Sequence, residues 1–392
     1  MISFEEAMET VLKHARPLPP VLTRIEDAVG RTLLEDVASA TDMPPFDKSA
    51  VDGYAVRAAG VKPGVELPCR GLIQAGADFK RPLRSGECVK IMTGAPVPAG
   101  ADAVVMVEYT LEKNGLVKFS AGIGRGDNIA RRGEDVKRGQ RILRRGTVIS
   151  IEHIAALAAA GRAEVKTGAL PSVALVNTGG EIVPPGRLLG RNRIYNSNGP
   201  MLAAMLKTDG VHAAPVIARD EPKALRAALA RALKADIVLV SGGVSMGDYD
   251  LVPGTLKALG VKQLFHKVRV RPGKPMFFGV KGRKLVFGIP GNPVANFMAY
   301  LAYIRPAIRS LASRPDCAPK FRDGECAVKF EPRTPRRALV LSKVCARNKY
   351  ALYGIDNNGS ADILALAEAN CFTMIKEKGS VKKGGSAKFL RW

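Results

Sequence analysis

The 392-residue sequence has no hydrophobic run long enough to cross a membrane. Its longest apolar stretches, such as residues 236–240, have the length of a strand, whereas a membrane-spanning helix needs about 20 apolar residues. Residues 1–20 are acidic and amphipathic and have no basic segment ahead of an apolar stretch, so they do not resemble a secretory signal. These absences predict a protein with no membrane span that acts in the cytoplasm.

The cysteines and histidines show none of the spacings that metal and redox sites use. The chain has six cysteines and four histidines, and no Cys-x-x-Cys or His-x-x-x-His pair occurs among them. Scattered cysteines of this kind are typical of buried, reduced thiols. We therefore expect neither a zinc centre nor a dithiol redox site.

Aromatic residues are scarce, whereas basic residues are in large excess. Aromatics make up 6% of the chain, and 60 Lys and Arg against 36 Asp and Glu give a formal net charge of +24. This excess favours anionic partners in general: nucleic acid, a membrane surface or a phosphorylated small molecule. Since no nucleic-acid module and no basic run with interleaved aromatics is recognisable, we expect no nucleic-acid partner.

The spacing of apolar residues and the frequency of Gly and Pro change several times along the chain. Residues 3–15 have apolar residues at helical spacing, and residues 151–160 predict a second helix that ends at Gly161. Between them, residues 44–149 consist of short apolar runs punctuated by Gly and Pro, which indicates β-rich structure.

Residues 171–312 alternate short strand patterns with helical patterns of 10–15 residues. This alternation predicts βαβ units and a parallel sheet. Residues 318–392 return to short alternating strands and predict a small β-domain.

In an open α/β sheet, ligands bind outside the carboxyl ends of the strands. One predicted strand is followed by SGGVSMGDYD at residues 241–250. Its glycines let backbone N–H groups approach a phosphate, and Ser241 and Ser245 add hydroxyl donors. Asp248 and Asp250 are carboxylates able to hold Mg²⁺ against that phosphate.

Two more strand exits and one turn have similar chemistry. The exit NTGGE carries Thr178 and Glu181, and the exit IPGNP precedes a helix that can start at Pro293. The turn RPGKP supplies Arg271 and Lys274 to an anion. Any one of these could be only a tight turn, but together they predict a nucleotide-like ligand.

Three polar, glycine-punctuated segments lie outside the predicted sheet: PPFDKSAVDGYA, TGAPVPAGAD and NIARRGED. Asp52, Thr93 and Asp135 within them fit two interpretations. They cap turns, which is the commonest role of Asp and Thr at such places, or they belong to a functional site.

Taken in order, seven motifs resemble those of the MoeA/gephyrin family, the molybdopterin molybdenumtransferases. They are PPFDKSAVDGYAV, IMTGAPVPAGADAVVM, NIARRGED, VALVNTGGE, SGGVSMGDYD, RPGKP and GIPGNPV. The resemblance runs from about residue 3 to 312 and continues more weakly to 392. It implies a multidomain α/β and β fold with a MogA-like parallel-sheet α/β domain. The implied domains are an elongated N-terminal domain (1–43 and 137–170), an inserted β-domain (44–136), the α/β molybdopterin-binding domain (171–312) and a C-terminal β-barrel (318–392).

The resemblance also implies an activity and partners. The family inserts molybdate into adenylylated molybdopterin with release of AMP and requires Mg²⁺. It acts as a homodimer, and molybdopterin adenylyltransferase is its upstream partner. The alternative is a paralogue that binds molybdopterin or serves as a scaffold without insertion activity.

Family positions carry over to residues of this chain in three groups. The catalytic group is Asp52, Thr93, Asp135, Glu181, Asp220, Asp250 and Lys274. The cofactor-binding group is Ser241, Gly242, Gly243, Ser245, Arg271, Lys274, Pro290, Gly291, Asn292, Pro293, Arg337 and Ser360. The Mg²⁺ ligands among them are Asp220 and Asp250.

Four positions depart from the family pattern. Gly180 replaces a carboxylate, Ala295 and Ala365 replace serines, and Ala130 replaces a basic residue. These changes remove oxygen and charge mainly from the implied molybdate subsite.

Overall fold

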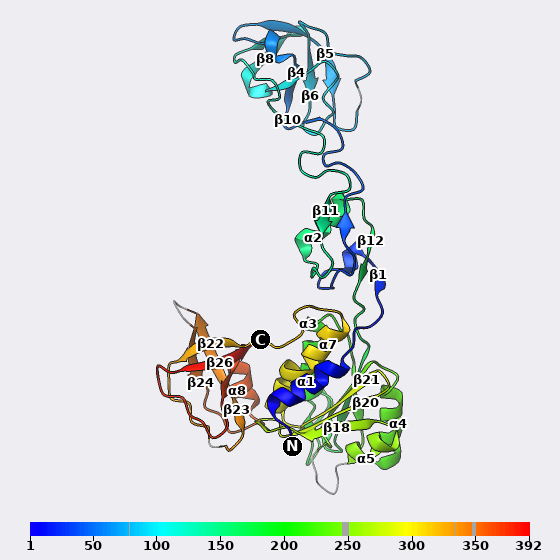
Figure 1. The fold of residues 1–392 in the computed structure, drawn as a ribbon, viewed down its shortest axis with the longest axis vertical. Helices are drawn as coiled ribbons and strands as arrows, with labels where there is room; N and C mark the ends of the chain where they lie inside the picture. The colour runs from blue at the N-terminus through cyan, green and yellow to red at the C-terminus, as the bar shows by residue number, and fades with distance from the viewer. Residues whose placement is uncertain (78, 245–250, 333, 347–349) are drawn as a thin grey trace. The chain divides into compact units, whose positions relative to one another are not determined.

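The computed structural model describes the chain except for residues 78, 245–250, 333 and 347–349. The described residues form two compact units. Figure 1 labels their helices and strands. The first comprises Met1–Thr23, Ala28–Leu34 and Lys166–Trp392, and the second comprises Arg24–Asp27 and Glu35–Val165. The four domain boundaries implied by the motifs stay a prediction. In the described residues, no helix is long and apolar enough to span a membrane.

The first unit is built on a six-stranded sheet with the order β16-β13-β17-β21-β20-β18. Its strands are β13 (Val173–Thr178), β16 (Pro215–Ala218), β17 (Ile237–Ser241), β18 (Lys262–Lys267), β20 (Pro275–Lys281) and β21 (Lys284–Ile289). The first four strands in this order are parallel, as predicted. β20 pairs antiparallel with both of its neighbours, which the sequence patterns did not predict.

Among its described residues, this unit has eight helical segments. They are α1 (Phe4–His14), α3 (Asn198–Thr208), α4 (Pro222–Ala232), α5 (Leu251–Ala258), α6 (Pro293–Ala299), the π-helical η4 (Tyr300–Ile304), α7 (Arg305–Leu311) and α8 (Ile363–Glu368). The predicted N-terminal helix is confirmed, and a capping box between Ser3 and Glu6 fixes its start. The predictions did not include α5 or α8.

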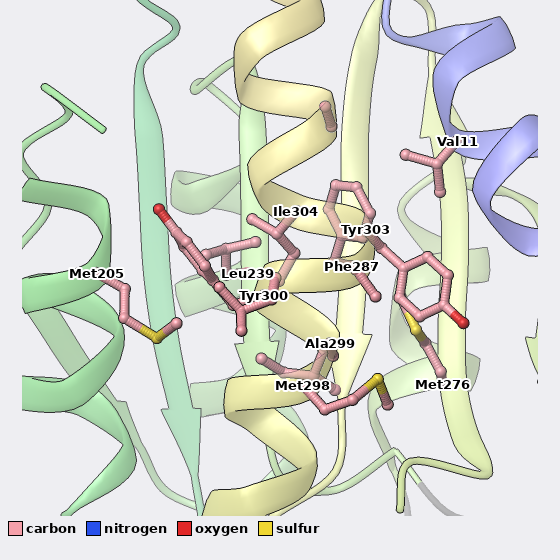
Figure 2. Packing of buried hydrophobic residues seen from close by; sticks show 14 of the residues in the cluster. Val11, Met205, Leu239, Met276, Phe287, Met298, Ala299, Tyr300, Tyr303 and Ile304 are labelled. Carbon is pink, nitrogen blue, oxygen red and sulfur yellow. The ribbon is translucent and has the colours of Figure 1, made fainter. Parts of the chain in front are cut away.

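Helices cover both faces of the sheet. Leu239 and Phe287 pack against α1, α3 and the long helix that begins with α6, whereas Val240 and Val286 pack against α4 and α5. This alternation follows from the two-residue period of a strand. Figure 2 shows the helix that carries Tyr300 lying over the strands of Leu239 and Phe287. The two cores fix the strands and therefore the edge at which they end.

The π-helical segment has a local cause. Pro306 follows it, and a proline has no N–H and clashes with the carbonyl of the residue four positions earlier. The wider π turn accommodates this clash, and the N–H of Arg305 donates to the carbonyl of Tyr300, five residues earlier.

Next to this turn, Asp209 lies in a largely buried polar cluster. Its side chain is only 7% exposed. It accepts hydrogen bonds from the Tyr300 hydroxyl at 2.7 Å and from Arg305 Nε at 2.8 Å. Burial, followed by this carboxylate, raises the pKa of Tyr300 well above its usual range, so the phenol stays protonated and donates.

The C-terminal part of the first unit is a closed five-stranded barrel. Its strands follow the order β23-β24-β22-β26-β25, and β25 pairs again with β23. They are β22 (Arg322–Cys326), β23 (Arg337–Ala346), β24 (Tyr350–Gly354), β25 (Cys371–Ile375) and β26 (Ser386–Arg391). The predicted small β-domain is therefore confirmed as a barrel. Trp392, the single tryptophan, packs on Phe297 of α6 and on Phe372 of β25, with ring centroids 4.8 and 5.1 Å apart.

Three short strands complete the first unit. β14 (Ile182–Val183) pairs with β15 (Ile194–Tyr195), and β19 (Val270–Arg271) pairs with β23 of the barrel. β1 (Val21–Arg24) and β12 (Glu164–Thr167) each cross a boundary between the two units along the chain.

The second unit is mainly β-structure, as its Gly- and Pro-punctuated sequence predicts. Its six-stranded sheet has the order β7-β4-β6-β5-β9-β8, and two small sheets pair β3 with β10 and β2 with β11. The strands are β2 (Val37–Ala38), β3 (Lys48–Ser49), β4 (Gly53–Val56), β5 (Glu66–Ile73), β6 (Cys88–Ile91), β7 (Ala103–Met106), β8 (Thr110–Lys113), β9 (Leu116–Phe119), β10 (Ile129–Ala130) and β11 (Arg141–Leu143). The helices are η1 (Ile25–Asp27), η2 (Ala58–Gly60), η3 (Val107–Tyr109) and α2 (Ile151–Ala159), and α2 confirms the predicted second helix.

The cysteines are free thiols, but only some of them are buried. Cys88, Cys326 and Cys371 are buried, and burial raises the pKa of the Cys88 thiol to about 12. Cys69 and Cys317 are half-buried, and Cys345 is exposed. Burial of the thiols was therefore predicted correctly for only three of the six.

The Asp209 cluster yields a stability prediction. We expect Asp209→Ala to lower the free energy of unfolding of the first unit by about 3 kcal/mol, since Tyr300 and Arg305 lose their buried acceptor. Arg219→Gln is the control, because Arg219 and its ion-pair partner have side chains 81% and 68% exposed and the change should cost less than about 0.5 kcal/mol. Urea unfolding followed by Trp392 fluorescence measures both, and equal losses would contradict the prediction.

Candidate active site

The carboxyl ends of three adjacent parallel strands form the edge at which the predicted motifs meet. Asn177 of β13 is in register with Ser241 of β17, and Ser241 is in register with Ile289 of β21. The connection that follows β13 leads to β16, which lies on one side of β13 in the sheet. The connection that follows β16 leads to β17, which lies on the other side of β13. This reversal places a topological switch point between β13 and β17, where open α/β sheets bind ligands.

The glycine-rich exit of β17 packs tightly against the end of β13. Gly242 and Gly243 have positive φ angles of 95° and 63°. A Cβ atom on Gly242 would lie 2.6 Å from the Thr178 carbonyl oxygen, and one on Gly243 would lie 2.9 Å from Thr178 Oγ1. The N–H of Gly242 donates to the carbonyl of Ile289, so it holds the two strand exits together instead of facing a ligand. Ser245, Asp248 and Asp250, the remaining predicted residues of this segment, lie outside the described residues.

Several buried polar atoms of this unit lack a hydrogen-bond partner within the described part of the chain. Four of them are Asn177 Oδ1, Thr178 Oγ1, Asn198 Oδ1 and Asn296 Oδ1, and the others in this unit include Thr32 Oγ1 and the Tyr303 hydroxyl. All four residues belong to the strand exits or to the helices that start beside them. A buried, unpaired polar atom costs about 1–3 kcal/mol, so such a group of atoms at a switch point is typical of a site that a polar ligand completes.

Asn198 joins two of the strand exits. From the start of α3, its Nδ2 donates to the Gly291 carbonyl at 2.5 Å and to Ser241 Oγ at 3.3 Å. Asn177, Asn198 and Asn296 were not among the site residues predicted from the sequence. The signal for Asn198 was the run YNSNGP directly before a helical pattern, because Asn and Ser are typical of such starts.

The predicted PGNP loop is linked to the barrel. Asn292 Nδ2 donates to Ser360 Oγ at 2.7 Å, and the N–H of Val294 donates to the Ser360 carbonyl at 3.1 Å. Asn296 is fully buried and donates through Nδ2 to the Pro290 carbonyl. The fold therefore brings Ser360 to this loop, and Pro290, Gly291, Asn292 and Pro293 form one edge of the site. The backbone N–H groups at the start of α6 were expected to be free, but the N–H of Val294 donates to the Ser360 carbonyl.

Two acidic residues lie at the same edge. Thr178 is in register with Ala218 of β16, so the segments after both strands are neighbours. Asp220 Oδ2 accepts a hydrogen bond from the N–H of Gly180 at 2.8 Å, and Glu181 is the exposed residue that follows.

The basic turn RPGKP also reaches this edge. It leads into β20, whose Phe277 is in register with Gly288 near the end of β21. Gly273 has a φ of 100° and lies against Met298 of α6, which leaves Lys274 exposed. Arg271 is likewise exposed.

Arg337 occupies a different environment from the other cofactor-binding candidates. It starts β23 beside Val270, forms an ion pair with Glu5 of α1, and lies 5.9 Å from the centroid of the Phe4 ring. Burial lowers its pKa from the usual value of an arginine. Its place is thus at the junction of α1 with the barrel, and its predicted role toward a ligand stays a prediction.

In the second unit, Asp52 and Thr93 contact each other directly. Asp52 Oδ1 accepts hydrogen bonds from the backbone N–H of Thr93 at 2.7 Å and from its hydroxyl at 2.8 Å. These bonds, the backbone one first, lower the pKa of Asp52 and keep the exposed carboxylate ionised. The pair fixes the turn after β6, so the cap interpretation accounts for its geometry while one carboxylate oxygen remains at the surface.

Asp135 lies in the neighbouring turn. Its side chain is exposed, and its N–H donates to the Met43 carbonyl at 3.0 Å. Close to it in sequence, Arg132 forms an ion pair with Asp42 at 2.6 Å. Among the described residues, no three His, Cys, Asp or Glu side chains gather in a way that could hold a metal ion.

Known proteins resemble this chain over nearly its whole length. The model of the MoeA N-terminal region (domains I and II) matches residues 2–161, and that of a probable molybdopterin-binding domain matches residues 174–310. A molybdopterin molybdenumtransferase of Staphylococcus aureus (strain Mu50) is 32% identical over 384 residues, which is 95% of this chain and 91% of that protein. The chain belongs to the MoeA family of molybdopterin molybdenumtransferases, transferases of molybdenum cofactor biosynthesis.

Further comparisons agree with this assignment. A molybdopterin molybdenumtransferase of Staphylococcus epidermidis is 30% identical over 383 residues, again 95% of this chain and 91% of that protein. The crystal structure of the molybdopterin biosynthesis MoeA protein of Pyrococcus horikoshii superposes with a TM-score of 0.80 at 29% identity. That match covers 100% of this chain and 99% of the other. The predicted multidomain fold of the MoeA family is therefore confirmed.

The four departures from the MoeA pattern lie in different surroundings. Ala295 in α6 and Ala365 in α8 are 2% and 5% exposed, so a serine hydroxyl at either position would lie among protein atoms. Gly180 is exposed and uses its N–H to hold Asp220. Ala130 is half-buried in β10, where it pairs with Lys48.

The glycine-rich exit yields a prediction with a matched control. Gly242→Ala and Gly282→Ala both place a side chain at positive φ, but only the Cβ at 242 meets other atoms, whereas nothing lies within 4 Å of the one at 282. We expect Gly282→Ala to cost about 1 kcal/mol of unfolding free energy and Gly242→Ala about 2–3 kcal/mol, because the second adds a steric clash to the backbone strain. Urea unfolding followed by Trp392 fluorescence measures the difference, and equal costs would show that the packing on Thr178 is loose.

The Asp52 contact yields a prediction about ionisation. We expect Thr93→Val to raise the pKa of Asp52 toward its ordinary value, because one of its two hydrogen bonds from Thr93 is lost. The bonded carboxylate stabilises the fold above its unfolded-state pKa, and this stabilisation is lost as the pH falls through the lowered folded-state pKa. Carboxyl ¹³C NMR titration measures the shift. Thr110→Val is the control, since Thr110 donates to the Val107 carbonyl, and it should leave the Asp52 titration unchanged.

Proposed function

We propose that the chain inserts molybdenum from molybdate into adenylylated molybdopterin and releases AMP. The observation that carries this proposal is the group of unpaired amide and hydroxyl oxygens at the switch point between β13 and β17. A heterocycle with several N–H donors would satisfy these acceptors, and the exposed Lys274 at the same edge would meet an anion. The curated relatives are named molybdopterin molybdenumtransferases, which agrees with a transfer of molybdenum to molybdopterin.

Mg²⁺ fits the residues at this edge. Asp220 and Glu181 present carboxylate oxygens, the ligands that Mg²⁺ prefers, and neither forms an ion pair within the described part of the chain. We assign Asp220 and Asp250 as its ligands, the second from the sequence alone. When bound, the ion would neutralise charge that develops on the phosphoryl oxygens of the AMP ester.

The chain's own residues have separate tasks in this proposal. Lys274 binds and orients the phosphoryl group and stabilises its negative charge as the bond to phosphorus breaks. Glu181 orients the attacking oxygen or accepts its proton. Ser241, held by Asn198, positions the glycine-rich exit, and the amide cluster holds the heterocycle in place. In the second unit, Asp52, Thr93 and Asp135 are proposed as functional residues of the same reaction.

The protein's assembly and its upstream partner form a separate part of this proposal. We propose that the protein works in the cytoplasm as a homodimer and receives its substrate from a molybdopterin adenylyltransferase. Sedimentation equilibrium tests the homodimer directly, because a mass near 41.8 kDa would identify a monomer and contradict it.

The activity is tested by incubating the purified protein with adenylylated molybdopterin, molybdate and Mg²⁺. AMP is measured by chromatography, and active cofactor by reconstitution of an apo-molybdoenzyme. We expect both products to require molybdate and Mg²⁺. Tight binding of the substrate without AMP or active cofactor would support the scaffold alternative and reject the enzyme.

A variant pair tests the assigned edge of the sheet. We expect Lys274→Gln to lower the rate of AMP release at least tenfold, since tenfold corresponds to about 1.4 kcal/mol of lost transition-state stabilisation. Lys262→Gln is the control, because Lys262 pairs with Val280 at the opposite end of β18 and β20 and should leave the rate unchanged. Equal rates in wild type and Lys274→Gln would remove Lys274 from the reaction.

A further inference from the structure

A basic and apolar loop extends from the edge that carries the site. Residues 184–193, here called the arginine arm, connect β14 to β15. The N–H of Ile194 donates to the Glu181 carbonyl at 2.9 Å, and the N–H of Asn196 donates to the Val183 carbonyl at 2.8 Å. Both ends of the arm are thus attached to residues of the candidate site, Glu181 on one side and the segment leading to Asn198 on the other.

The arm has three positive charges that the described residues do not neutralise. Arg187, Arg191 and Arg193 are all exposed, and no ion pair within the described part of the chain involves any of them. Elsewhere, arginines beside acidic residues form close pairs, such as Arg131 with Asp47 at 2.8 Å. Three unpaired guanidinium groups within seven positions create a local positive field that favours an anion beside the site.

The arm also exposes apolar side chains. Leu188 is 98% exposed and Leu189 is 49% exposed. Removing a leucine side chain from water is favourable, so a ligand that covers these residues would gain binding energy. The combination of arginines and leucines fits a small organic anion that has both a phosphate and a flat ring system.

We propose that the arginine arm folds over the bound substrate, with its arginines on the phosphate groups and its leucines on a ring. This inference rests on the proposed function, because that function supplies an AMP ester as the ligand. The arm then acts in binding and in the exclusion of water, while Glu181 and Lys274 act on the reacting atoms.

Trypsin reports on the arm without any measurement of activity. Trypsin cleaves after arginine and lysine, so Arg187, Arg191 and Arg193 make the exposed arm a site of tryptic cleavage in the full-length protein. We expect millimolar AMP with Mg²⁺ to slow cleavage in the arm several-fold. Cleavage at Lys378 and Lys382, which are exposed in a loop of the barrel, is the internal control and should not change. Equal cleavage of the arm with and without AMP, at AMP concentrations shown to saturate the protein, would overturn the proposal.

Variants separate the charged and apolar contributions. We expect the triple change Arg187→Gln, Arg191→Gln and Arg193→Gln to weaken AMP binding at least tenfold, measured by calorimetry, and to reduce its salt dependence. The double change Leu188→Ser and Leu189→Ser should weaken binding of AMP but not of inorganic pyrophosphate, which has no ring.

A matched triple change in the barrel is the control. Lys376→Gln, Lys378→Gln and Lys382→Gln remove the same charge from exposed positions and should leave AMP binding within twofold of wild type. If this control weakens binding as much as the arm variant, the effect is one of total charge and the proposal fails. If the wild-type protein does not bind AMP at all, the arm proposal fails, and the turnover assay with adenylylated molybdopterin decides the proposed function separately. If it binds AMP and the arm variants bind equally well, only the arm proposal fails.

Discussion

The parallel pairing of β13, β17 and β21 is the constraint on which the rest of the first unit depends. Register between Asn177, Ser241 and Ile289 makes three strands end in one row. Because side chains alternate along these strands, helices can bury both faces, and this double burial holds the row in place. Motifs that lie more than 100 residues apart in the chain then meet at a single edge.

The same edge carries a local cost in stability. Asn177, Thr178, Asn198 and Asn296 bury polar oxygens without partners in the described residues, at about 1–3 kcal/mol for each such atom. Two hydrophobic cores and hydrogen bonds such as that from Asn198 to Gly291 stabilise the surrounding backbone and offset this loss of free energy. The backbone around these oxygens is therefore held by packing and by neighbouring hydrogen bonds, and not by bonds to the oxygens themselves.

Basic charge has more than one use in this protein. The net charge of +24 creates a general attraction for anions, but many of the arginines form ion pairs within the protein, as Arg132 does with Asp42. Lys274 in the RPGKP turn and the three arginines of the arm are exposed, and we propose that they bind an anion at the sheet edge. In this proposal, position relative to the site, and not total charge, distinguishes a binding group from a solvated one.

The sequence by itself determined the family, the alternation of strands and helices in the first unit, and most of the motif residues at the sheet edge. These follow from local properties: hydrophobic period, glycine-rich turns and the order of the motifs. Tertiary structure decided the rest. Asn198 contacts Gly291 across 93 residues, and Ser360 contacts Asn292 across 68 residues. Arg337 pairs with Glu5, and β20 runs antiparallel to its neighbours. No local pattern encodes such contacts, because each one depends on which distant segment the packing of the two cores brings alongside.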